Sequence, residues 1–451
     1  MVVRIQAAQI KNFHNIAFGE IRFPCNISSD IFAPKADVLG IYGQNSSGKT
    51  TFLHALDILK SLLTGKSITE HLSKHIALLN KSAEISFHFS ILTDTGEKIR
   101  AVYSVILEKS NIIETLKTTY FRDKKWSYLK AAISCDLSDT QTLFLPKSRE
   151  KEYWGFNQEY YAELRVNKLL CAKELRSFIF SEEFLELLDR VKIDSPDASV
   201  VRTLHKFGVD NLFVILQRSS DLMFLNTPPN THLSPEHTIT KPFALPLDKP
   251  FLLSESMYPV IKQTIDTVNT VLMELIPQTR IALRSLGNEL LENVQVGILV
   301  QVMREHQTVN GEISYLPFQY ESAGVKKIVS VLHLIISAYN NPSMTLAIDD
   351  LDSDVYEYLL GELLHIMQAT GQGQLIFTSH SLRPLETLAT NSAVFTTMNA
   401  ENRYIRLSNI KITNNLRLRY LREIALGSDS STSFSAEINS SEIAHAMRKA
   451  K

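Results

Sequence analysis

The stretch DVLGIYGQNSSGKTT, residues 37–51, decides the fold. It opens with a short apolar run, Asp37–Tyr42, that predicts a buried strand, and leucines and isoleucines at helical spacing predict a helix over Thr50–Leu63. Between them the sequence satisfies the pattern GxxxxGK[ST]. The residues of this pattern are Gly43, Gln44, Asn45, Ser46, Ser47, Gly48, Lys49 and Thr50. A loop of this kind between a strand and a helix predicts a phosphate-binding site.

The chemistry of such a loop points to a nucleoside triphosphate. Its backbone N–H groups and the positive end of the following helix surround the β-phosphate, and Lys49 reaches the β and γ oxygens. The Thr50 hydroxyl is placed to bind Mg²⁺. We therefore expect ATP and Mg²⁺ as ligands, with the next residue, Thr51, also at the nucleotide.

A second apolar strand, Met344–Ile348, ends in the carboxylates of Asp349 and Asp350. Acidic pairs at strand ends often only cap a loop. In a chain with a P-loop, Asp349 is expected to hold the hydration shell of Mg²⁺, and Asp350 to polarise the attacking water. An aspartate reaches less far than the glutamate usual at this position, so slow or gated hydrolysis is expected.

A third strand, Gln374–Thr378, leads to His380. A histidine at such a position is often only a polar strand terminus. The strand before His380 follows the strand before Asp349 by about 30 residues, which is the spacing along the sequence expected for neighbouring parallel strands. The carboxyl ends of two such strands would face one crevice together with the P-loop. We expect His380 to contact the γ-phosphate. The predicted catalytic residues are therefore Lys49, Asp350 and His380.

Periodicity outlines the rest of the fold. Apolar and polar residues alternate over Val2–Ala8 and Ile16–Phe23 and again from Ala83 to Leu129, which predicts antiparallel strands. Residues from about 150 to 282 predict helices, interrupted by a proline-rich loop at 227–250 that we expect to lack regular structure. The expected helices are Glu159–Phe180, Glu182–Val191, Gly208–Ser219 and Met257–Leu275. Strands are expected to return at Arg280–Leu286, Val294–Arg304 and Glu312–Phe318, followed by helices at Val325–Tyr339 and Val355–Ala369.

These elements predict an α/β protein with a mixed central sheet and an antiparallel β subdomain, split by a helical insertion. The two parts of this head are residues 1–148 and 283–426, and the insertion is 149–282. Residues 427–451 are expected to form a flexible tail. The alternative for the tail is a short partner-binding helix that includes Ile443.

Composition excludes several classes of protein. A formal net charge of −1 shows no general attraction to nucleic acid or to anionic membranes. Cys25, Cys135 and Cys171 lie far apart without CxxC spacing, which indicates reduced thiols. The N-terminus lacks the features of a signal peptide, and the longest apolar stretch, Ile328–Tyr339, is too short to span a bilayer. We expect a cytoplasmic protein without a membrane partner.

The order of these motifs resembles the head of ABC-type ATPases, in the branch that contains RecF, SMC and OLD proteins. The resemblance rests on Ile10-Lys11-Asn12-Phe13 and on IYGQNSSGKTTFLHALDILKSLLTG, LAIDDLDSDVYEYLLGELL and GQLIFTSHSLRPLETL. These stretches are similar to the AAA-15 ATPases, which occur as sensor subunits of anti-phage systems such as PARIS and, less closely, Septu. The similarity covers residues 1–130 and 280–425.

The resemblance implies roles that the residues alone do not. Ser322 is a good N-cap and Gly324 permits close backbone approach, which alone indicates an ordinary helix start. By position they match the ABC signature, which contacts the γ-phosphate bound to a second protomer, and Leu351-Asp352-Ser353 matches the D-loop. ATP would then join two heads into a homo-oligomer, a dimer or a ring of dimers. Ser46 stands where many relatives have glycine, Ala323 replaces a signature glycine, and Asp350 replaces the glutamate.

The sequence is compatible with three functions. The first is a defence ATPase that senses a phage protein and controls a separately encoded effector such as a TOPRIM-like nuclease. We expect the effector to be separate because the strands, short helix and tail predicted after His380 do not correspond to a nuclease domain. The second is a repair or recombination ATPase that binds duplex DNA through the basic segment Arg403–Arg422, although that segment alone more often indicates a solvated face. The third is a nucleotide-binding scaffold with negligible hydrolysis. Nucleic acid as a partner stays undecided.

Overall fold

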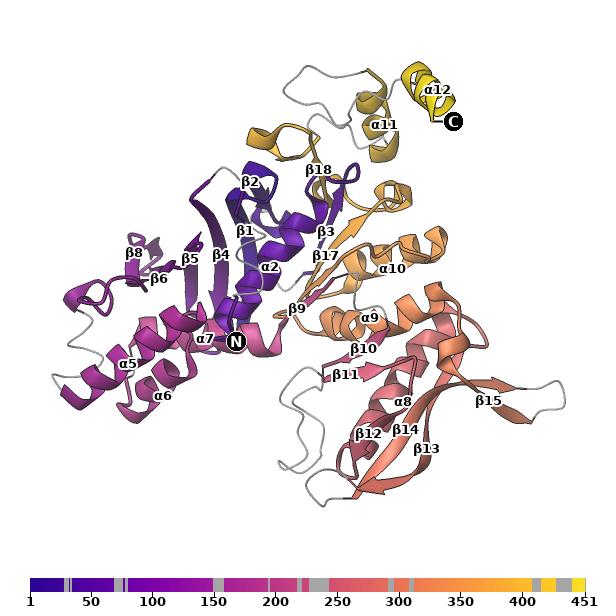
Figure 1. Ribbon diagram of the computed structural model, residues 1–451, viewed down its shortest axis with the longest axis horizontal. Helices are drawn as coiled ribbons and strands as arrows, with labels where there is room; N and C mark the ends of the chain where they lie inside the picture. Colours follow the sequence, from indigo (N-terminus) through magenta and orange to yellow (C-terminus); the bar gives the residue numbers. More distant parts are fainter. Residues whose placement is uncertain are drawn as a thin grey trace.

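The computed structural model describes residues 1–27, 32, 35–68, 76–77, 80–148, 158–193, 195–216, 221–226, 243–290, 296–307, 312–407, 415–426 and 440–450. Its strands form a central sheet, an antiparallel sheet on one side, and a further β lobe on the other (Figure 1). None of the helices in these ranges is long and apolar enough to cross a membrane.

The central sheet has the strand order β19-β18-β3-β17-β16-β9. Its strands are β3 (Asp37–Tyr42), β9 (Leu212–Ile215), β16 (Thr345–Ile348), β17 (Gln374–Ser379), β18 (Ala393–Thr396) and β19 (Tyr404–Ile405). Only the β18–β19 pairing is antiparallel. In the register, Ser379 lies beside Tyr42 and Phe377 beside Ile348. The carboxyl ends of β3, β17 and β16 therefore meet at one edge of the sheet.

Opposite faces of this sheet belong to two hydrophobic cores. Leu39 and Ile41 of β3 pack in the core that contains α2 (Lys49–Leu63) and the antiparallel sheet. Val38 and Tyr42 pack on the other face with α9 (Ala323–Asn340) and α10 (Glu357–Thr370). Because side chains alternate along a strand, an uninterrupted apolar run serves a sheet covered on both faces. The expected strand–loop–helix order around residues 37–63 is confirmed.

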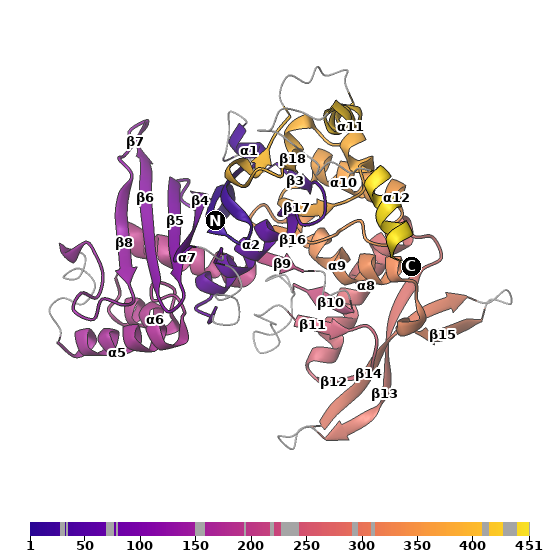
Figure 2. The ribbon, with the colours of Figure 1, turned by 45° about the horizontal axis from the view of Figure 1, so that its top comes forward.

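The antiparallel sheet has the order β2-β1-β4-β5-β6-β7, with β8 also paired to β6. Its strands are β1 (Val2–Phe13), β2 (Ile16–Arg22), β4 (Ser82–Leu92), β5 (Lys98–Glu108), β6 (Ile112–Arg122), β7 (Lys125–Trp126) and β8 (Lys130–Asp136). Helices α5 (Gln158–Glu174), α6 (Glu182–Arg190) and α7 (Pro196–Asp210) lie along it, and the short α1 (Pro24–Ile27) follows β2 (Figures 1 and 2). The α/β class with a mixed central sheet and an antiparallel subdomain is confirmed.

A third lobe is built from α8 (Met257–Leu275) and strands that hold a core of their own. The strands are β10 (Leu222–Leu225), β11 (Phe243–Pro246), β12 (Phe251–Ser254), β13 (Arg280–Leu290), β14 (Val296–Gln307) and β15 (Ile313–Pro317). The described remainder is α11 (Leu416–Leu426), α12 (Ser440–Lys449) and the 3-10 turns η3 (Phe318–Tyr320), η4 (Arg383–Glu386), η5 (Thr390–Ser392) and η6 (Ala400–Asn402).

Two sequence predictions are wrong. Residues Leu212–Ile215 were expected to be helical but form β9, which extends the central sheet beside β16. Apolar runs this short fit a buried strand as well as a helix, and the free edge of β16 selects the strand. Within the proline-rich 227–250, Phe243–Pro246 form β11, and residues 227–242 lie outside the described part. The tail contains the helix α12, which includes Ile443 and so agrees with the alternative of a short helix, and its binding of a partner stays a prediction.

A buried glutamine joins the two large sheets. The Gln374 Oε1 accepts hydrogen bonds from the Ile5 N–H (2.8 Å) and the Thr345 hydroxyl (3.0 Å), and its Nε2 donates to the Ile5 carbonyl (2.7 Å) and to Asp37 Oδ2 (2.9 Å). All hydrogen-bonding positions of the amide are thus used at a site without solvent access. This network fixes β1 against β3 and β16.

Replacing Gln374 with leucine should destabilise the protein by about 2–5 kcal/mol, because each buried polar group left unpaired costs about 1–3 kcal/mol. Denaturation in urea, followed by far-UV circular dichroism, measures the change. Gln372→Leu is the matched control, since its side chain is exposed two residues away. Equal unfolding midpoints for the two variants would contradict this role of Gln374.

Candidate nucleotide site

The P-loop uses left-handed backbone at three positions. Gly43 has φ 152°, Ser46 62° and Gly48 100°. A Cβ at Gly43 would lie 1.8 Å from the Thr396 hydroxyl, so only glycine fits there. Ser46 stands where many relatives have glycine, and the serine backbone is strained at this φ. The Asn15 side chain holds the strained turn by donating a hydrogen bond to the Ser46 carbonyl (2.7 Å).

Lys49 lies at the centre of the loop. Its ammonium donates hydrogen bonds to the carbonyls of Gly43 (2.8 Å) and Gln44 (3.0 Å). Burial lowers the pKa of Lys49, and the carboxylates of Asp350 and Asp349 oppose that shift. The loop therefore wraps a buried cation, which is the charge that bound phosphate oxygens require.

The ends of β16 and β17 place two carboxylates across from the start of α2. Asp349 Oδ1 accepts hydrogen bonds from the hydroxyls of Thr50 (3.2 Å) and Thr378 (2.6 Å). The Thr378 hydroxyl in turn accepts a hydrogen bond from the Asp350 N–H (2.8 Å), which helps hold Asp350 in a left-handed conformation (φ 44°). A carboxylate and a hydroxyl oxygen side by side are the hard ligands that Mg²⁺ prefers. Thr50 and Asp349 therefore fit the metal-binding role predicted for them.

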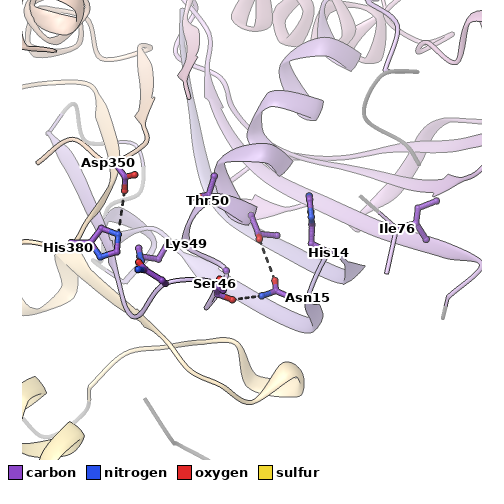
Figure 3. Close-up of a pocket in the computed structure, with 11 residues that line it drawn as sticks. His14, Asn15, Ser46, Lys49, Thr50, Ile76, Asp350 and His380 are labelled. Atoms are coloured by element: carbon purple, nitrogen blue, oxygen red, sulfur yellow. Dashed lines mark hydrogen bonds and ion pairs between the residues drawn. The ribbon is translucent and has the colours of Figure 1, made fainter. Parts of the chain in front are cut away.

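His380 faces Asp350 across the site. The two side chains approach within 3.8 Å between Nε2 and Oδ1, an ion-pair distance when the imidazole is protonated (Figure 3). The backbone N–H groups of His380 (2.9 Å) and Ser381 donate to Asp352 Oδ2, so the predicted D-loop aspartate positions the histidine. Burial raises the pKa of the Asp350 carboxyl, and the neighbouring Asp349 raises it further.

A cavity of about 540 Å³ joins these groups (Figure 3). Its lining combines the P-loop, the β1–β2 turn and the ends of β16 and β17. The lining residues are His14, Asn15, Asn45, Ser46, Gly48, Lys49, Thr50, Thr51, Ile76, Asp350 and His380. Burial, with a contribution from His54, lowers the pKa of His14 to about 4, so its ring is uncharged at neutral pH. The predicted P-loop, Asp350 and His380 thus share one cavity.

The signature segment lies apart from this cavity. Ser322 caps α9, accepting a hydrogen bond from the Val325 N–H (3.4 Å). A Cβ at Gly324 would lie 2.2 Å from the Asp354 carbonyl oxygen, so the glycine is required where α9 meets the chain after the D-loop. Ser322 and Gly324 line a different cavity, of about 660 Å³. The structure does not bring them to the P-loop of their own chain.

Most of the chain matches the model of one protein family. Residues 38–385 match the family model described as "AAA domain, putative AbiEii toxin, Type IV TA system". The chain belongs to this AAA family. No curated protein matches it.

Solved structures similar to this AAA-family chain include SMC heads and RecF. The Smc head of Pyrococcus furiosus bound to the C-terminal domain of ScpA has 11% identity and a TM-score of 0.40, covering 94% of this chain and 99% of that one. The SMC head of Thermotoga maritima has 12% identity and a TM-score of 0.36, with 90% and 100% covered. RecF with ATP has 12% identity and a TM-score of 0.38, with 90% and 99% covered.

Sequence reasoning missed several residues that build the site of this AAA-family member. Lys327 of α9 is buried and donates a hydrogen bond to the Asp349 carbonyl (3.1 Å). Arg403 donates to the Asn15 carbonyl (2.5 Å), and the Tyr404 hydroxyl donates to the Gly48 carbonyl (2.7 Å). None of these contacts follows from a local pattern, because each one joins segments far apart in the sequence.

Two helical glycines provide a matched test of the signature segment. Gly324→Ala should destabilise the protein by about 1–3 kcal/mol, since the new methyl group collides with the backbone at Asp354. Gly361→Ala, inside α10, meets only Arg383 Cγ at 3.9 Å and should stabilise it by about 0.5–1 kcal/mol. Urea unfolding midpoints measure both, and shifts of the same sign would contradict the close approach at Gly324.

Proposed function

We propose that this protein binds ATP with Mg²⁺ at the cavity beside the P-loop and hydrolyses it. One observation carries the proposal. Lys49 and Thr50 meet Asp349, Asp350 and His380 at a single edge of the sheet, although about 300 residues of sequence separate the two groups. Membership of a AAA family supports the same activity.

Each side chain has a separate part in the proposed reaction. Lys49 and the N–H groups of the loop neutralise and orient the phosphates, exchanging the carbonyl contacts of the lysine for phosphate oxygens. Thr50 and Asp349 would hold Mg²⁺, which supplies positive charge at the β and γ oxygens. Asp350 orients the attacking water and accepts its proton. His380 is placed to contact the γ-phosphate.

Asp350→Asn should lower kcat for ATP hydrolysis by about 10²–10⁴-fold, the usual contribution of a positioned base. Asp350→Glu should raise kcat, because the longer side chain extends the reach of the carboxylate. Phosphate release measures both, with Asp248→Asn, exposed in the third lobe, as the control. Unchanged turnover in Asp350→Asn would contradict the catalytic role of Asp350 and favour a nucleotide-binding scaffold.

We further propose that two heads close on ATP and that the assembly acts as a defence sensor. Ser322 and Gly324 lie outside their own nucleotide cavity, which supports a contact with the nucleotide of a second copy. The description of the family mentions a putative toxin of a toxin–antitoxin system, which is compatible with control of a toxic effector. A phage protein would be the trigger, and a separately encoded TOPRIM-like nuclease would be the effector.

The sensor proposal predicts that the purified protein alone does not cut nucleic acid. Incubation with Mg²⁺, ATP and either DNA or RNA should leave both intact, and cleavage should require the product of a neighbouring gene. The assay is gel electrophoresis of labelled substrates. Robust cutting by the protein alone, abolished by a substitution outside the P-loop, would make the chain itself the toxic enzyme.

The alternative, a repair ATPase that binds duplex DNA through Arg403–Arg422, loses much of its support. Arg403 is buried and donates to the Thr397 and Asn15 carbonyls, and Arg406 donates to the backbone at Asn391, Ala393 and Arg22. Arg417 pairs with Glu386 and Arg419 with Glu423. Lys411 lies outside the described residues. These four arginines are engaged within the protein, whereas Arg422 is exposed, so the described part of the segment does not form a continuous free basic surface.

A further inference from the structure

A basic and aromatic hairpin projects from the antiparallel sheet. It spans residues 117–130, from the second half of β6 through β7 to the start of β8, and we call it the basic hairpin. In Figure 2, β7 lies at the tip of the sheet, opposite the end near α5 and α6. The hairpin has one acidic residue, Asp123. Its cations are Lys117, Arg122, Lys124, Lys125 and Lys130, all of them exposed.

The tip of the basic hairpin is a tight turn. Arg122 pairs with Lys125, and the two residues between them, Asp123 and Lys124, have φ 51° and 61°. Two left-handed residues in a two-residue loop fit a type I′ turn, whose twist matches that of the flanking strands. The cations are therefore displayed on a hydrogen-bonded ribbon and do not belong to a loose loop.

Aromatic rings lie among these cations. The Arg100 guanidinium lies 4.2 Å from the centroid of the Trp126 ring, and the ring centroids of Phe121 and Trp126 are 5.2 Å apart. The Tyr128 side chain is 87% exposed, and Phe121 is also exposed. Exposed aromatic rings beside cations offer flat faces on which planar groups stack while the cations bind anions.

A cavity of about 300 Å³ lies beside Tyr128 and Lys130. Its wall includes the buried carboxylate of Asp197, which already accepts hydrogen bonds from the hydroxyls of Thr118 (2.8 Å) and Tyr120 (2.7 Å). Both hydrogen bonds end on Oδ1 of Asp197, and apart from Ala131 the other described residues of this wall have cationic, hydroxylic or aromatic side chains.

The basic hairpin is remote from the nucleotide cavity. Strands β5 and β6 pair from Ile99 with Tyr120 at the hairpin end to Leu107 with Ile112 at the other end. At the end with Leu107 and Ile112, Ile106 of β5 pairs with Glu84 near the start of β4. Glu84 also pairs with Lys11 of β1, which lies three residues before His14 of the nucleotide cavity. The hairpin and the nucleotide site thus lie at opposite ends of one sheet.

We propose that the basic hairpin binds single-stranded nucleic acid. A polyanion is indicated by five exposed cations against one acid on a chain whose net charge is −1. The exposed ring of Tyr128 favours a ligand with unpaired bases, on which the ring can stack. In a duplex the faces of the bases are buried, and an acidic protein has no bases. Lys124, Lys125 and Lys130 contact phosphates, and Tyr128 stacks on a base.

The test measures binding of labelled single-stranded oligonucleotides, one of DNA and one of RNA, to the full chain by fluorescence anisotropy. Tyr128→Ala should weaken binding by at least about fivefold, as expected for the loss of one stacked base. Lys124→Gln/Lys125→Gln should reduce the slope of log K against log salt by about 1.4, since each phosphate contact on a single strand contributes about 0.7. Binding of either DNA or RNA supports the proposal.

The control is Lys249→Gln/Lys262→Gln, which removes the same charge from exposed positions in the third lobe and should leave affinity and slope unchanged. Far-UV circular dichroism checks that each variant is folded. Three results would overturn the proposal: no binding at low salt, equal losses in the control pair, or wild-type affinity in Tyr128→Ala. A matched duplex or polyglutamate that competes as well as the single strand would also overturn it and indicate a purely electrostatic surface.

Discussion

The parallel hydrogen bonding of β3, β17 and β16 is the constraint on which the rest of the structure depends. It aligns Tyr42 with Ser379 and Ile348 with Phe377, so three loops leave the sheet at the same edge. Each loop carries one part of the site: the P-loop, the pair of aspartates, or His380. A shift of one residue in either pairing would turn buried side chains to the opposite face and move these parts away from one another. Gln374 stabilises this register from the opposite end of the strands.

Opposite charges lie close together at this edge of the sheet. Two buried lysines, Lys49 and Lys327, lie close enough to Asp349, Asp350 and Asp352 for their charges to interact. Burial lowers the pKa of both lysines and raises that of Asp350, while each opposite charge reduces the shift. The three aspartates outnumber the two lysines, and a triphosphate with one Mg²⁺ adds further negative charge. The lysines and the metal ion therefore compensate only part of the negative charge in this partly buried site.

Sequence reasoning singled out the residues that meet at this candidate site because each signal is local: a glycine-rich loop between strand and helix, and polar residues at the ends of apolar strands. It failed where the deciding contact is not local. Residues Leu212–Ile215 carry no signal that separates strand from helix, and only the edge of β16 makes them β9. Arg403 belongs to a basic run in the sequence, yet its partners are backbone carbonyls brought together by folding. The left-handed conformation of Ser46 likewise depends on Asn15, more than 30 residues before it.

Lys49 is the cation proposed to hold the phosphates, and the other proposed roles at this site depend on it. Isothermal titration of wild type and Lys49→Ala with ATP and Mg²⁺, combined with light scattering of the same samples, tests it in one experiment. We expect wild type to bind ATP and change its assembly state, and Lys49→Ala to do neither while remaining folded. Equal ATP affinity and equal assembly in the two proteins would contradict it.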